Sequence, residues 1–161
     1  MMRDNLQVMK FGGTSVGNAE CIRRVADIVA RAAGAGPVVV VVSAMGGVTN
    51  RLMEAARASA AGDMGAAGNL ADILRRQHHE AIETLIGDGD ERPQLTAELN
   101  RIIQDVTSLC RGTALLRELT PRALDAISSA GERLSARLLA SALREVGLSR
   151  FNSHCTESYF P

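Results

Sequence analysis

The sequence predicts an α/β domain in which a short parallel sheet is followed by a helix-rich remainder. Three observations support this class. Residues 6–11 have the composition of a strand that Gly12-Gly13 ends. Residues 18–33 carry apolar side chains at helical spacing, and residues 38–42 are an unbroken run of valines, typical of a central strand that is covered on both faces. Strand, helix and strand in this order predict a βαβ unit with parallel strands.

The rest of the chain is predicted to be mainly helical. Periodic apolar residues predict helices over about 50–61, 70–86 and 94–119. Thr120-Pro121 marks a further helix start, because proline is favoured at the first helical position. A start near Ser128 or Ser129 leads into a helix over 133–146, which Gly147 ends. Two predicted strands are too few for the sheet of a complete α/β domain with this many helices, so we expect the domain to be incomplete.

The composition indicates a globular protein and argues against several functions. Of 161 residues, 46% are hydrophobic and 22% charged, and 18 basic residues balance 18 acidic ones. A net charge of zero gives no field to attract nucleic acid or an anionic membrane, so we predict no nucleic-acid or membrane partner. The three cysteines lie far apart and outside any C-x-x-C pair. This spacing favours reduced thiols in the cytoplasm and gives no indication of a metal site.

The strongest local signal is residues 10–16, KFGGTSV, in which a strand ends in a lysine and two glycines. Consecutive glycines let backbone N–H groups approach a phosphate, and the Lys10 ammonium can neutralise charge on a transferred group. This arrangement suits phosphoryl transfer, although a plain glycine turn with a chance lysine is the alternative. Lys10 is also the only lysine of the chain. The segment matches neither the P-loop nor the G-x-G-x-x-G pattern.

Two further segments carry groups suited to a small polar ligand. Residues 43–50, SAMGGVTN, follow the valine strand and offer glycines together with Ser43, Thr49 and Asn50 as neutral hydrogen-bond partners. The alternative is that Thr49 or Asn50 only caps the next helix. Residues 128–135, SSAGERLS, place Glu132 in the first turn of a helix. It is either the partner of a substrate ammonium or a glutamate that the helix dipole and a capping box with Ser129 favour at this position.

Two other clusters are interpreted as features without a catalytic role. His78 and His79 are adjacent on a predicted helix, so they point in different directions and are expected at the surface. Asp88 and Asp90 resemble the opening of a calcium loop but lack its later ligands, so a solvated turn is expected.

The three segments, in this order and at these separations, resemble the amino-terminal part of an aspartate kinase of the amino-acid kinase superfamily. The resemblance runs from about Val8 to Gly147, and KFGGTSV is its most specific part. It implies a three-layer αβα amino-acid kinase-like fold, of which residues 1–148 form the amino-terminal half. Glutamate 5-kinase, acetylglutamate kinase and uridylate kinase share the fold and the opening glycines, so another member of the superfamily is an alternative.

The resemblance implies ATP-dependent phosphorylation of L-aspartate to 4-phospho-L-aspartate, the first step of lysine, threonine and methionine biosynthesis. Lys10 would be the catalytic residue that holds the transferring phosphoryl group. The ATP site would comprise Lys10, Phe11, Gly12 and Gly13. L-Aspartate would bind Ser43 and Thr49, with its ammonium on Glu132. Mg²⁺ would bind through the ATP phosphates.

The chain departs from the family pattern in its carboxyl-terminal part. A member would continue past Gly147 into the half of the domain that holds the nucleotide, whereas residues 149–161 form an atypical tail, as a truncated or frameshifted reading frame would give. We therefore expect the chain to be incomplete and inactive alone. A non-catalytic module that pairs with a complete kinase chain, or a homo-oligomer, is a further hypothesis.

Overall fold

The structure is a computed structural model and describes residues 6–148. Its first elements are β1 (Gln7–Phe11), α1 (Ala19–Ala33) and β2 (Val38–Val42), which form the predicted βαβ unit. The two strands pair in parallel, from Gln7 opposite Val38 to Phe11 opposite Val42. Asn18 caps α1, because its Oδ1 accepts a hydrogen bond from the Cys21 N–H at 2.9 Å. The predicted α/β class and its order of elements are confirmed.

The remaining described elements are helices: α2 (Val48–Ala60), α3 (Ala66–Leu85), α4 (Glu91–Leu116), α5 (Pro121–Ser128) and α6 (Ala130–Glu145). The predicted start at Thr120 is confirmed, since the Thr120 Oγ1 accepts from the Ala123 N–H at 3.1 Å. Gly147 follows α6 with φ of 91°, a conformation that glycine adopts without strain. The Leu148 N–H then donates to the Leu143 carbonyl at 3.0 Å and closes the end of that helix.

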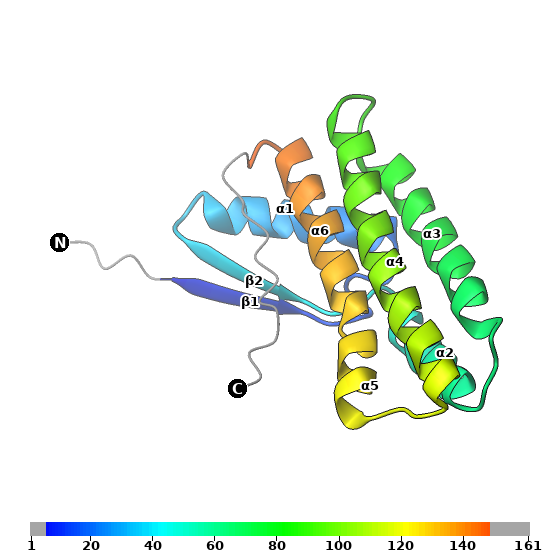
Figure 1. The fold of residues 1–161 in the computed structure, drawn as a ribbon. Coiled ribbons are helices and arrows are strands. Elements are labelled where there is room, and N and C mark those ends of the chain that lie inside the picture. The colour runs from blue at the N-terminus through cyan, green and yellow to red at the C-terminus, as the bar shows by residue number, and fades with distance from the viewer. Residues whose placement is uncertain (1–5, 149–161) are drawn as a thin grey trace.

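The helices gather on one side of the two strands (Figure 1). Helices α3, α4 and α6 run beside one another, and α1 packs against α6. The core lies among these helices. Its largest fully buried side chains include Ile22 of α1, Ile103 of α4, and Leu134, Leu138 and Leu143 of α6. Most of the apolar surface removed from water therefore belongs to the helices rather than to the sheet.

The two strands are covered on one face only among the described residues. Met9, Phe11, Val40 and Val42 pack against the core. Side chains that alternate with them point the other way, and Val8, Val39 and Val41 are 65%, 45% and 47% exposed. The prediction that both faces of the valine strand are covered is therefore wrong for residues 6–148. The physical reason is that α1 and α6 contact β2 from the core side, and no described element crosses the opposite face.

Residues 149–161, predicted as an atypical tail, lie outside the described residues. The division of the chain at residue 148 stays a prediction.

Candidate active site

The first loop of the predicted site follows directly from β1. Lys10 is exposed and pairs with Val41, so it lies on the uncovered face of the sheet, one residue before the strand ends. The Gly12 carbonyl then accepts hydrogen bonds from the Ser15 N–H at 2.9 Å and the Val16 N–H at 3.2 Å, which turns the chain towards α1. The N–H groups of Gly12 and Gly13 donate to no described residue. They remain available to an anion, as the sequence predicts for a phosphate-binding loop.

The second loop begins where β2 ends and is held by hydrogen bonds on two sides. The Gly46 N–H donates to the Gly17 carbonyl at 3.2 Å, which joins this loop to the first one. The Gly46 carbonyl accepts from the Gln77 Nε2 of α3 at 3.0 Å. Ala44 and Met45, which precede Gly46 in this loop, are buried. The backbone of the loop is therefore fixed by its neighbours, and the half-buried Ser43 stands at its start.

The alternative role of Thr49 or Asn50 as a helix cap is wrong. Helix α2 begins earlier, and its N-cap is Gly47, with φ of 77° and no side-chain cap hydrogen bond. Thr49 and Asn50 lie inside the first turn, where their side chains form no hydrogen bond with a described residue. The Thr49 hydroxyl is half-buried and is not used by the fold in the described part of the chain. This leaves it open to a ligand.

The third segment packs directly on the second. A Cβ placed on Gly131 would lie 2.7 Å from the Ala44 Cβ and 3.1 Å from the Val48 Cγ1. Only glycine allows this close approach of α6 to the second loop. The adjoining Glu132 is half-buried in the first turn of α6. Its carboxylate makes no hydrogen bond or ion pair with the described residues.

The capping-box interpretation of Glu132 is also wrong. Ser129 has helical backbone angles and makes no side-chain cap hydrogen bond to α6. Its hydroxyl donates instead to the Ala126 carbonyl at 3.1 Å, back into α5. Glu132 still lies in the first turn of α6, where the helix dipole favours a carboxylate, and its role as a ligand partner stays a prediction.

These contacts bring all three segments to the carboxyl ends of the two parallel strands. Gly17 meets Gly46, and Ala44 meets Gly131. The carboxyl ends of parallel strands are where open α/β sheets bind their ligands. The convergence of the segments is observed, whereas the roles of Lys10, Phe11, Gly12, Gly13, Ser43, Thr49 and Glu132 stay predictions.

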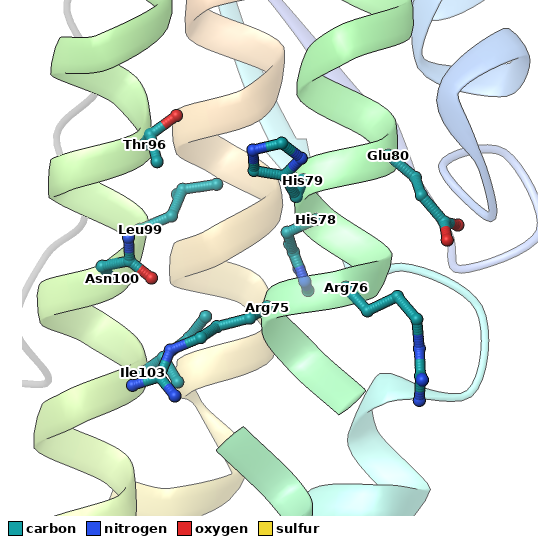
Figure 2. A pocket seen from close by; sticks show the side chains of 9 residues that line it. All are labelled: Arg75, Arg76, His78, His79, Glu80, Thr96, Leu99, Asn100 and Ile103. Atoms are coloured by element: carbon teal, nitrogen blue, oxygen red, sulfur yellow. The ribbon is translucent and has the colours of Figure 1, made fainter. Parts of the chain in front are cut away.

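Two grooves lie along the helices α2, α3 and α4. One, of about 510 Å³, runs along α2 and the first part of α3, and it includes Gly47 and Asn50 of the second segment. The other, of about 470 Å³, lies between α3 and α4 (Figure 2) and includes no residue of the three segments. In that view Arg75 extends towards α4, whereas Arg76 and Glu80 point away from it.

The groove between α3 and α4 contains a residue that the sequence analysis placed wrongly. His78 is 1% exposed, so the expected surface position is wrong for it, whereas the neighbouring His79 is exposed. The His78 Nδ1 lies 2.8 Å from the Leu74 carbonyl, and its Nε2 is buried with no hydrogen-bond partner among the described residues. Burial lowers the pKa of His78 against the opposing effect of this hydrogen bond. The signal for burial is its spacing of four residues from Leu74, which itself follows Leu70 by four.

The two described cysteines, Cys21 and Cys110, are free. Burial is the larger effect on Cys110 and raises the pKa of its thiol, against a hydrogen bond with Ser59 that lowers it. Among residues 6–148, no group of three or more histidine, cysteine or acidic side chains could hold a metal ion. No helix of the described range is long and apolar enough to cross a membrane.

A βαβ unit that gathers glycine-rich loops at the carboxyl ends of its strands is the arrangement in which open α/β proteins bind their ligands. Comparison with known proteins makes this specific, because the family model of the amino acid kinase family matches residues 5–160. The chain therefore belongs to the amino acid kinase family. Within that family the chain is similar to aspartokinases, as the resemblance of the three segments predicts.

The relatives are considerably longer than this chain. Aspartokinase 1 of Arabidopsis thaliana is 32% identical over 143 residues, which cover 88% of this chain and 24% of the relative. Lysine-sensitive aspartokinase 3 of Escherichia coli is 32% identical, with 86% of this chain and 28% of the relative covered. The chain thus spans about a quarter of the length of the curated relatives that it matches.

Solved structures give the same result for the fold. E. coli aspartokinase III in complex with aspartate and ADP superposes with a TM-score of 0.74 at 31% identity, covering 88% of this chain and 29% of that chain. The complex of the same enzyme with lysine and aspartate gives a TM-score of 0.75 at 30% identity. The amino-acid kinase fold is therefore confirmed, with a helix-rich region and a small parallel sheet.

Proposed function

We propose that this chain supplies the amino-terminal half of an aspartate kinase active site. The observation that carries the proposal is the contact of three separate segments at one end of the sheet, through Gly17 with Gly46 and Ala44 with Gly131. The likeness to an aspartokinase solved with aspartate and ADP supports the choice of substrates. The proposed reaction converts ATP and L-aspartate into ADP and 4-phospho-L-aspartate, at the start of lysine, threonine and methionine biosynthesis. We place it in the cytoplasm, which the free thiols of Cys21 and Cys110 support.

Phosphoryl transfer depends mainly on positioning and on neutralising charge. In the proposed half-site, the Lys10 ammonium and the N–H groups of Gly12 and Gly13 hold the γ-phosphoryl group. A side-chain carboxylate oxygen of aspartate attacks its phosphorus, and the bond from phosphorus to the bridging oxygen of ADP breaks. Charge-assisted hydrogen bonds contribute about 1.5–3 kcal/mol each, so loss of Lys10 is expected to cost about tenfold to a hundredfold in transition-state stabilisation.

The same site orients the acceptor. The hydroxyls of Ser43 and Thr49 are proposed to bind L-aspartate, and the Glu132 carboxylate to hold its ammonium. Mg²⁺ on the ATP phosphates supplies further charge neutralisation when bound.

Ligand binding tests this proposal on the purified 161-residue chain. Titration calorimetry with ATP should show binding about tenfold or more weaker for Lys10→Ala. The matched control is Arg31→Ala, which removes an exposed cation from the last turn of α1. Glu132→Gln should weaken L-aspartate binding, whereas Glu118→Gln at an exposed position should not. A folded wild-type chain that does not bind L-aspartate at millimolar concentration would contradict the half-site.

Turnover is a separate question from binding. We expect the chain alone to release no aspartate-dependent ADP, because the nucleotide site is predicted to need more of the domain. Steady turnover that Lys10→Ala abolishes would make the chain a working kinase by itself and would contradict that expectation. Another acid of similar size that binds in place of L-aspartate would point to a different amino-acid kinase.

A further inference from the structure

The loop after β2 ends in two consecutive glycines, Gly46 and Gly47, directly before α2 begins. Gly47 has φ of 77°, in the left-handed region. Glycine adopts positive and negative φ about equally well, so the peptide bond between two glycines keeps one orientation only where its neighbours hold it. A change in this orientation would redirect the start of α2, and Thr49 lies in the first turn of that helix.

Both polar backbone groups of Gly46 are bonded to other segments of the chain. Its N–H donates to the Gly17 carbonyl at 3.2 Å, and its carbonyl accepts from the Gln77 Nε2 at 3.0 Å. The N–H belongs to the peptide bond before Gly46, whereas the carbonyl belongs to the peptide bond that leads into Gly47. Gln77 of α3 is therefore the side chain that holds the bond between the two glycines.

The loop cannot obtain this restraint from a side chain of its own. A Cβ on Gly46 would lie 3.2 Å from the Gly17 carbonyl oxygen, and a Cβ on Gly13 would lie 3.5 Å from the Ala44 carbonyl oxygen. The first two loops thus meet through backbone atoms, and a larger residue at Gly46 would push them apart. A hydrogen bond from outside the loop restrains the peptide bond without occupying this space.

Gln77 is half-buried, and it lies outside the three segments that converge at the ends of the strands. A carbonyl only accepts hydrogen bonds, so the amide nitrogen of Gln77 must face Gly46. We propose that Gln77 is a positioning residue, whose hydrogen bond fixes the loop and so places Ser43 and Thr49 for L-aspartate. This inference rests on the proposed function, which assigns the substrate to those two hydroxyls. Gln77 acts through the loop and not on the substrate.

Titration of the full 161-residue chain with L-aspartate tests the proposal. Gln77→Met keeps the length of the side chain but removes the donor, and it should weaken binding about threefold to tenfold, as loss of one neutral hydrogen bond does. Gln77→Lys keeps an N–H donor on a side chain one atom longer and should recover most of the affinity. Titration in about 0.3 M salt limits the effect of its added charge. The matched control is Gln104→Met at an exposed position of α4, which should leave the affinity unchanged.

Nuclear magnetic resonance of the ligand-free chain gives a second readout that does not depend on L-aspartate. In Gln77→Met, the amide resonances of Gly46 and Gly47 should shift, broaden or split, because their common peptide bond loses its restraint. Gln104→Met should leave these resonances in place. Urea unfolding of the same variants measures the contribution of each side chain to stability.

The outcomes separate this inference from the proposed function. If Gln77→Met lowers stability but binds L-aspartate as the wild type does, the hydrogen bond only supports the fold and the positioning role is overturned. Unchanged resonances of Gly46 and Gly47, or equal weakening by Gln104→Met, would overturn it as well. A wild-type chain that does not bind L-aspartate would contradict the proposed function, and shifted resonances would then still assign the orientation of the loop to Gln77.

Discussion

The helical body and the two-stranded sheet differ in how completely they bury their apolar residues. Leu134, Leu138 and Leu143 of α6 are fully buried, whereas Val39 and Val41 of β2 are about half exposed. Both regions have strongly apolar sequences, so composition does not explain the difference. The helices find their partners within the described chain, and one face of the sheet does not. Stability is therefore expected to reside mainly in the helices.

Truncation of a core leucine should give the largest effect. Leu138→Ala removes a side chain that is 0% exposed and should lower the free energy of unfolding by about 2–5 kcal/mol, since it loses apolar burial and leaves a cavity. Val39→Ala, on the exposed face of β2, should cost less than about 1 kcal/mol. Urea unfolding followed by circular dichroism measures both variants. Equal losses would contradict the division between the two regions.

The second largest loss of stability is expected where α6 packs against the loop that follows β2. Gly131→Ala places a Cβ 2.7 Å from the Ala44 Cβ, and neither atom belongs to a flexible side chain. We expect a loss of about 1–3 kcal/mol and weaker L-aspartate binding, because the second loop must shift. Thermal unfolding and calorimetry report the two effects.

Gly112→Ala is the matched control for this change. Gly112 lies within α4 and has no heavy atom within 4 Å of a built Cβ. Alanine there should raise stability by about 0.5–1 kcal/mol through helix propensity alone. The two substitutions are chemically identical, so opposite signs isolate the contact with Ala44. Stabilisation by both would remove the argument for close packing.

Much of this arrangement follows from local sequence patterns, and the exceptions have physical causes. The sequence correctly predicts the bounds of β2, the N-cap of α5 at Thr120 and the end of α6 at Gly147. Each of these features depends on residues that are neighbours in the chain. Whether both faces of β2 are buried depends on residues that are distant in the chain. A run of five valines alone therefore cannot predict it.

The positions of individual polar residues show the same limit. Thr49 and Ser129 are residue types that cap helices. The N-cap of α2 is nevertheless Gly47, and Ser129 has helical backbone angles between α5 and α6 and makes no side-chain cap hydrogen bond. His78 is polar by type but follows the buried stripe of α3. The convergence of the first two segments was predictable from the order of strand, helix and strand. The contact between Gly131 and Ala44 was not, because it depends on how α6 packs.

Acid should weaken the helical body through His78. Burial lowers the pKa of this side chain below its usual value of 6.5, so the unfolded chain binds a proton that the folded chain resists. Stability is therefore unaffected well above pH 6.5 and falls as the pH drops below it, by at most about 1.4 kcal/mol per pH unit for one proton. Denaturation between pH 7.5 and 5.5 should show this loss.

Two histidine variants sharpen the assignment. His78→Gln should flatten the pH dependence between 7.5 and 5.5, whatever it costs in stability at pH 7.5. His79→Ala removes an exposed imidazole 3.4 Å from Glu83 and should leave the dependence in place. If the pH dependence disappeared in the His79→Ala variant, its source would be the exposed pair of His79 and Glu83 rather than the buried His78.

The smallest effect is expected from an ion pair that joins the start of α4 to the end of α6. Glu91 accepts hydrogen bonds from Arg144 at 2.6 Å and from the Ser141 hydroxyl, and the Arg144 hydrogen bond is the main cause that lowers the pKa of Glu91 below its usual 4.5. This contribution is present above pH 4.5 and is lost as the pH falls through the lowered value. The pair is partly exposed to solvent, so Arg144→Ala should cost at most about 1 kcal/mol at pH 7.

High salt should reduce that cost, because solvent ions screen a partly exposed pair. Arg31→Ala, which removes an exposed arginine from the last turn of α1, is the control for loss of a cation. A loss of several kcal/mol for Arg144→Ala, insensitive to salt, would mean that the junction of α4 and α6 depends on the charge as strongly as the core depends on Leu138. Since both helices already meet through buried leucines and isoleucines, the ion pair is expected to orient their ends rather than hold them together.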